Sequence, residues 1–96
     1  MKTRDEVIII LTTVKPELEK RFKIKRMALF GSYARGEQRE TSDVDILVEV
    51  DPSIGLKFVT LADEIEKTLG LPVELVSHRA VSHRNMAFIE KDLIYV

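Results

Sequence analysis

An alternation of residue types between positions 43 and 50 constrains the fold of this chain more than any other feature. Val44, Ile46, Val48 and Val50 are apolar, and three of the four residues that precede them are acidic. Successive side chains of a β-strand point to opposite faces of a sheet, so this pattern predicts a strand with one face in the core. Such a face is buried by packing helices or a second sheet against it.

Three other segments predict helices. Apolar residues recur at helical spacing from Val7 to Phe22, where Pro16 either kinks the helix or opens a second one. Residues 58–69 show the same spacing, and a glycine follows them, as at many helix ends. A last helix is expected within residues 80–91, where it would bury Met86 and Ile89.

Short apolar runs predict three more strands, at residues 27–30, 73–76 and 93–96. Between the first of these and the alternating strand, a short helical turn and a polar loop are expected. The order is then helix, strand, strand, helix, strand, helix, strand. We therefore expect an α/β (α+β) fold with a small mixed sheet of about four strands and flanking helices.

Length and composition narrow the class of protein. The chain has 96 residues, 45% apolar and 32% charged, which predicts a single folded domain over residues 1–96. It has no cysteine, and its longest apolar run has five residues, so we expect a soluble cytoplasmic protein without a membrane partner. A net charge of −1 argues against direct nucleic-acid binding. Five basic residues between Lys20 and Arg26 fit a solvated helix end, or a surface that attracts a polyanion.

Two aspartates stand at the start of the alternating strand. Asp43 and Asp45 are two positions apart, so they project to the same face of a strand. Like charges this close repel each other, and a divalent cation neutralises them most directly. Mg²⁺ prefers carboxylate oxygens and usually keeps water and substrate phosphates as its other ligands. The pair by itself also fits a turn capped by residues 42–43 and followed by an exposed aspartate, and both interpretations stay open.

Two further positions are candidates for a site. Gly31 and Ser32 lie between an apolar strand and a helical turn, where a glycine, free N–H groups and a hydroxyl suit a phosphate. A plain strand-to-helix turn explains the same dipeptide. Glu74 interrupts the apolar segment 71–76, and a buried carboxylate without a partner is costly. It either faces solvent or joins the two aspartates around a metal ion.

Together these residues form one pattern: Gly31-Ser32, ten residues, then Asp43-Val44-Asp45. The pattern resembles the signature of the minimal nucleotidyltransferases, the smallest members of the DNA polymerase beta superfamily. Residues 30–37 and 42–49 match as well, and the resemblance extends over nearly the whole chain. It implies a polymerase-beta-like nucleotidyltransferase core.

The resemblance also implies ligands and residue roles. The chain would bind ATP as substrate and Mg²⁺ as cofactor, with two ions expected. The third acid of the family falls on Glu74, where the family more often has Asp. Arg35 is common in the motif and is expected near phosphate or in bracing the loop. The implied site therefore has nucleotide-binding Gly31, Ser32 and Arg35, and catalytic, metal-ligating Asp43, Asp45 and Glu74.

The activity that the resemblance implies is transfer of AMP from ATP to a tyrosine of a HEPN-domain toxin, so that the chain acts as an antitoxin. A chain of 96 residues has no room for a separate substrate domain, which favours an acceptor that docks as a protein. An alternative is a catalytically weak nucleotide-binding module that neutralises its partner by binding. Oligomeric state, homo-oligomers included, stays open.

Several residues that often form sites have simpler interpretations. His78 and His83 are five positions apart, about 140° around a helix, so they would not share a face as metal ligands do. We expect both on the surface or at a partner contact. Met86 and Phe88 are expected in the core or in an interface.

Overall fold

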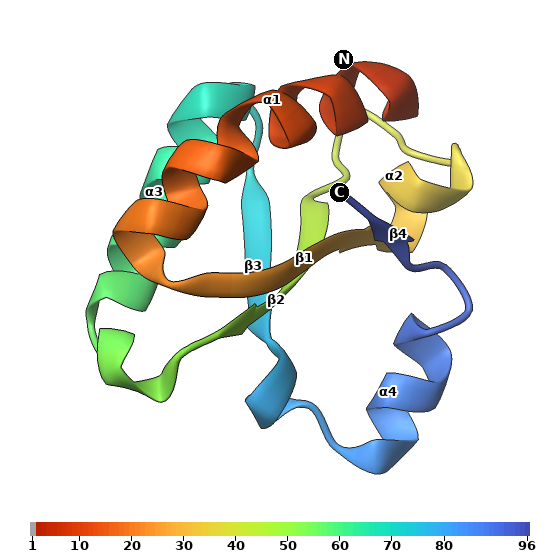
Figure 1. Ribbon diagram of the computed structural model, residues 1–96. Coiled ribbons are helices and arrows are strands. Elements are labelled where there is room, and N and C mark those ends of the chain that lie inside the picture. The colour runs from red at the N-terminus through yellow and green to blue at the C-terminus, as the bar shows by residue number, and fades with distance from the viewer. Residues whose placement is uncertain (1) are drawn as a thin grey trace.

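A four-stranded sheet with two long helices on one of its faces forms the body of the molecule in the computed structural model, which describes residues 2–96 (Figure 1). The strands are β1 (Ile24–Phe30), β2 (Val44–Val50), β3 (Val73–Ser77) and β4 (Ile94–Tyr95), in the order β3-β2-β1-β4. β2 pairs antiparallel with β1 and parallel with β3, and β4 pairs antiparallel with β1. The predicted α/β (α+β) fold with a small mixed sheet is confirmed.

The helical elements follow in chain order. The α-helices are α1 (Arg4–Phe22), α2 (Gly31–Arg35), α3 (Lys57–Leu69) and α4 (His83–Ile89), and two short 3₁₀ turns are η1 (Pro52–Ile54) and η2 (His78–Ala80). α1 continues through Pro16 as one helix, so of the two interpretations of this proline the structure excludes a second helix. No helix among residues 2–96 has the length and apolar character needed to cross a bilayer.

The core lies between the sheet and the pair α1 and α3. Val44, Ile46 and Val48 are fully buried, which confirms the predicted apolar face of β2. α1 and α3 each contribute a stripe of apolar side chains at helical spacing to the same cluster. Burying each large apolar side chain contributes roughly 1.5–3 kcal/mol, so this layer supplies most of the stabilisation. The opposite face of the sheet carries the acidic residues of β2.

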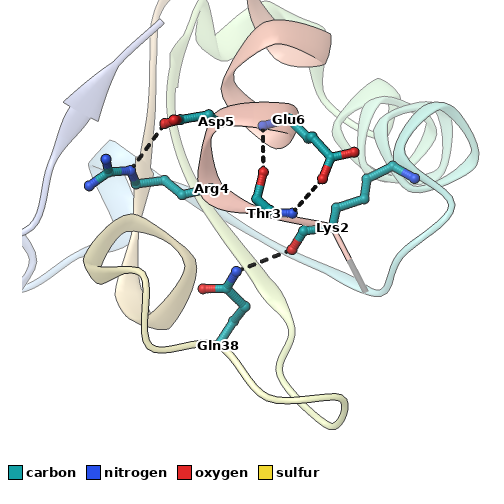
Figure 2. Close-up of polar contacts among 6 residues, drawn as sticks. All are labelled: Lys2, Thr3, Arg4, Asp5, Glu6 and Gln38. Carbon is teal, nitrogen blue, oxygen red and sulfur yellow. Dashed lines mark hydrogen bonds and ion pairs between the residues drawn. The ribbon is translucent and has the colours of Figure 1, made fainter.

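The N-terminal end of α1 is fixed by polar contacts that Figure 2 shows. The Thr3 hydroxyl accepts a hydrogen bond from the Glu6 N–H at 3.1 Å, and the Thr3 N–H donates to the Glu6 carboxylate at 3.0 Å. This capping box satisfies two backbone donors that the helix itself leaves free. Gln38 donates from Nε2 to the Lys2 carbonyl at 3.1 Å, which ties the loop between α2 and β2 to the start of the chain.

α4 is placed differently from the prediction. It lies apart from α1 and α3 in Figure 1 and has no buried residue. Met86 and Ile89 are half-buried, so the expectation that they enter the core is wrong. Phe88 is 65% exposed, which also excludes a core position for it. A helix of seven residues is too short for its spacing alone to show whether another layer covers it.

Candidate active site

The acidic residues meet where three strands run side by side. Phe30 of β1 is the register partner of Asp45 of β2, and Asp45 is the partner of Glu74 of β3. Partners on neighbouring strands lie about 5 Å apart, and their side chains point to the same face. Glu74 is exposed, as one of its two interpretations predicts, and it also lies beside Asp45, as the role beside the two aspartates requires.

The environment of Asp45 raises the pKa of its carboxyl from 3.8 to about 6. Burial is the largest cause, because it removes water from the charged form. A hydrogen bond with Glu74 and the negative charge of Glu74 come next, and the charge of Asp43 adds to them. The positive charge of Arg35 acts in the opposite direction. The three acids therefore influence each other, as a site that collects a cation requires.

Asp43 itself lies immediately before β2 and is exposed. Among residues 2–96, no group of three or more His, Asp or Glu side chains is arranged to hold a metal ion. Asp45 and Glu74 still present the adjacent carboxylates that suit Mg²⁺, which is usually bound through one or two carboxylates together with substrate phosphates. The acids therefore fit an ion that arrives with a nucleotide better than a preformed metal centre.

Gly31 makes the close packing around Asp45 possible. Its φ angle is +75°, in the left-handed region that side chains other than glycine rarely adopt. A Cβ atom placed there would overlap Oδ2 of Asp45. Gly31 begins α2, and Ser32 follows it half-buried, so the bend at residues 31–32 lies directly against the Asp45 carboxylate. The predicted neighbourhood of the Gly-Ser pair and the acids is present in the fold.

Arg35 ends α2 and points to an acidic partner. Its Nη1 donates to Oδ2 of Asp92 at 2.7 Å, and its Nε lies 3.5 Å from the carboxylate of Glu37. Asp92 belongs to the segment that leads from α4 into β4, so this ion pair connects α2 to that segment. Of the two expected roles, the contacts support bracing of the backbone near the site.

A cavity of about 400 Å³ opens beside the acids. Asp45 and Glu74 line it from the sheet, and Asn85 and Phe88 line it from α4. Its other walls are mostly apolar: Phe30, Val76, Val81 and Ile89. The size is within the range of pockets that bind small molecules. Asp45 lines this cavity and also packs against Gly31, so the cavity and the bend at residues 31–32 adjoin at one candidate site.

Comparison with known proteins assigns this arrangement to a family. A family model described as a nucleotidyltransferase domain matches residues 11–96. The chain belongs to this family of nucleotidyltransferases. Protein adenylyltransferase MntA of Thermococcus cleftensis is 42% identical over 98 residues, which cover all of this chain and 98% of that protein. The predicted membership of the minimal nucleotidyltransferases is thereby confirmed.

Two solved structures are similar in fold to this nucleotidyltransferase. A structure provisionally assigned as a minimal nucleotidyltransferase is similar with a TM-score of 0.81 and 29% identity, over 97% of this chain and 95% of that chain. A crystal structure described as a toxin-antitoxin with AMP-PNP is similar with a TM-score of 0.69 and 26% identity, over 98% of this chain and 72% of that chain.

The cavity walls of this nucleotidyltransferase were not identified from the sequence. Phe30 and Val76 lie on the acidic face because of their register with β2, and no local pattern gives that register. Asn85 and Phe88 reach the cavity because α4 crosses beside the acids. An aromatic residue in a short helix was the one available signal. His78 and His83 are exposed, as expected.

The basic stretch Lys20–Arg26 is partly neutralised within the fold. Arg21 pairs with Glu64 of α3, and Arg26 donates to Glu49 of β2 at 2.9 Å. These ion pairs favour the interpretation as a solvated helix end over a surface that attracts a polyanion.

Proposed function

We propose that this nucleotidyltransferase transfers AMP from ATP to a tyrosine hydroxyl of a HEPN-domain toxin and thereby acts as an antitoxin in the cytoplasm. The observation that supports this most is the placement of Asp45 between Glu74 and the bend at Gly31. Carboxylates beside a glycine-containing bend provide the two halves of a site for a metal-bound triphosphate.

The acids supply the metal-binding half of the proposed site. Asp43, Asp45 and Glu74 would hold Mg²⁺, with two ions expected. When bound, Mg²⁺ neutralises phosphate charge and lowers the pKa of the acceptor hydroxyl. Asp45 has a raised pKa because of burial and its acidic neighbours, so a nearby cation favours its charged form. The metal-binding half of the site would therefore be complete only when the nucleotide and its Mg²⁺ are bound.

The bend supplies the phosphate-binding half. Gly31 has no side chain, so a phosphate oxygen can approach its backbone closely. Ser32 adds a hydroxyl donor, and together they would hold the β- and γ-phosphates. Arg35 would keep α2 in place through Asp92. In the reaction the acceptor oxygen forms a bond to the α-phosphorus, and the bond between the α-phosphorus and the oxygen that bridges it to the β-phosphorus breaks. Pyrophosphate then leaves, and the hydroxyl proton is released to solvent.

Relatives support the choice of acceptor. The Thermococcus cleftensis relative is named a protein adenylyltransferase, so its acceptor is a protein. A structural relative is a toxin-antitoxin crystallised with AMP-PNP, an analogue of ATP. We extend both statements to this chain because the two comparisons cover all and 98% of this chain, respectively. The toxin is then the protein that presents the acceptor hydroxyl.

The test is intact-mass spectrometry of a HEPN-domain protein encoded beside this gene, after incubation with the chain, ATP and Mg²⁺. We expect the mass of the partner to rise by whole AMP units. Asp43→Asn and Asp45→Asn should abolish the increase while their circular dichroism spectra stay native. An unchanged partner mass together with measurable nucleotide binding would instead support the binding module, and would overturn the proposed transfer.

A further inference from the structure

The order of the site residues across the sheet gives the site two sides. The bend at Gly31 follows β1, Asp45 lies on the central strand β2, and Glu74 lies on β3. Neighbouring strands are about 4.8 Å apart, so the bend and Glu74 stand roughly 10 Å apart with Asp45 between them. A reaction that is centred at Asp45 therefore has a side toward Gly31 and a side toward Glu74.

Transfer of AMP is a displacement at the α-phosphorus, and it needs both the Gly31 side and the Glu74 side of the site. The attacking and the leaving oxygens lie roughly in line on opposite sides of the phosphorus. With the β- and γ-phosphates at residues 31–32, pyrophosphate leaves on that side, and the acceptor oxygen must come from the direction of Glu74. This step rests on the proposed function, because it takes the phosphate position from it.

The cavity extends from Asp45 to the Glu74 side of the site, and it also reaches Phe30 of β1. Beyond the acids and Phe30, its walls are formed by Val76 of β3, Ala80, Val81 and the helix α4. The walls are apolar except for Asn85, whose side-chain amide can donate to or accept from a hydroxyl. An aliphatic hydroxyl of serine or of a sugar would leave these apolar walls in contact with water. A phenol ring covers them and brings a hydroxyl to the acids.

Phe88 is the exposed part of this wall. Its side chain is 65% exposed although it lines the cavity, and the Lys91 ammonium lies 5.4 Å from its ring centroid. α4 buries no residue of its own, so Phe88 has little structural role in this chain. Aromatic rings attract one another beyond the effect of buried area, which suits Phe88 to a second ring.

We propose that the cavity between Glu74 and α4 is the acceptor subsite, in which Phe88 and Asn85 position an aromatic hydroxyl of the partner for attack on the α-phosphorus. Phe88 is then a specificity-determining residue that contacts the acceptor ring. The adenine base of ATP is the competing occupant of the same walls, and the experiment below separates the two.

The experiment measures AMP transfer at saturating ATP over a range of concentrations of the HEPN-domain partner, which gives kcat and KM, for the unchanged chain, Phe88→Ala, Phe88→Tyr and Ile9→Ala. Ile9 on α1 is also 65% exposed but lies outside the site, which makes it a matched control. AMP-PNP affinity is measured in parallel by calorimetry. We expect Phe88→Ala to lower kcat by about tenfold, the size expected for losing an aromatic contact. Phe88→Tyr should restore kcat, and AMP-PNP affinity and melting temperature should not change.

Other results would overturn the proposal. An unchanged kcat with a raised KM for the partner would make Phe88 a docking contact outside the reaction. A loss of AMP-PNP affinity in Phe88→Ala would place the adenine base in the cavity. An equal loss of kcat in Ile9→Ala would show a general effect of surface truncation. If the unchanged chain transfers no AMP, the proposed function itself fails and the acceptor subsite fails with it, whereas transfer that is insensitive to Phe88→Ala refutes the subsite alone.

Discussion

Replacing Asp45 with asparagine should stabilise the protein at pH 8 when Mg²⁺ is removed with a chelator. In the folded chain the pKa of Asp45 is raised to about 6 by burial and by its acidic neighbours, whereas an unfolded aspartate has a pKa near 3.8. The folded state therefore binds this proton more tightly than the unfolded state does. Stability falls as the pH rises from about 4 to about 6, and the full penalty is present above that range.

The size of the effect follows from the same difference. Each tenfold change in proton affinity is worth about 1.4 kcal/mol, so a wholly desolvated carboxyl would cost about 3 kcal/mol. Asp45 is only half-buried, and solvent screens part of its repulsion, which leaves about 1–2 kcal/mol. For a domain of this size, that corresponds to a rise in melting temperature of roughly 5–10 °C.

The assay is thermal unfolding followed by circular dichroism at pH 8 and at pH 4, with chelator present. Asp45→Asn should melt higher than the unchanged chain at pH 8 and about equally at pH 4. Asp63→Asn is the control, because Asp63 is an exposed aspartate of α3 that forms no ion pair with another residue of the range 2–96. Equal melting temperatures at pH 8, or the same gain at both pH values, would refute the reasoning.

Further predictions concern the same site and its supports. Glu74→Gln should also stabilise the chelated protein at pH 8, and the double variant with Asp45→Asn should gain less than the sum in melting experiments, because either change removes the repulsion. Gly31→Ala should lower the free energy of unfolding in urea by more than 1 kcal/mol, as a rough minimum, because of the positive φ and the overlap with Asp45; a smaller loss would mean that the bend relaxes easily. Thr3→Ala should cost about 1 kcal/mol in the same assay through loss of the capping box, and no change would show that α1 does not need it. Arg35→Ala should cost less than about 1 kcal/mol in the same assay, since its ion pairs are exposed, and a larger loss would show that these pairs contribute more than exposed pairs usually do.

The parts of the fold that could be predicted are those with local periodicity. The apolar positions of β2 and of the helices α1 and α3 have a clear period, and most of them are buried as expected, whereas Val14, Phe58 and Ala62 are half-buried. Pro16 was ambiguous because a proline removes one helix hydrogen bond without always ending a helix. α4 was expected to bury Met86 and Ile89, but burial depends on whether another element covers the helix, which its own sequence does not contain.

Some features of the candidate site could also be predicted from local sequence, and others depend on the pairing of distant strands. Asp43 and Asp45 could be recognised from their spacing, and Gly31 from its place before a helical turn. The contact between Asp45 and Glu74 depends on the parallel pairing of β2 with β3, which brings together residues far apart in the chain. The overlap that a side chain at Gly31 would have with Asp45 is likewise visible only in three dimensions.

The central claim is that Glu74 works with Asp43 and Asp45 at one site, and the transfer rate of Glu74→Gln tests it most directly. Pyrophosphate release is followed with ATP, Mg²⁺ and the HEPN-domain partner for Glu74→Gln, Asp45→Asn and their combination. If the acids act as a unit, each single variant falls to the background rate and the combination is no slower. A Glu74→Gln variant that releases pyrophosphate at the rate of the unchanged chain would contradict the claim.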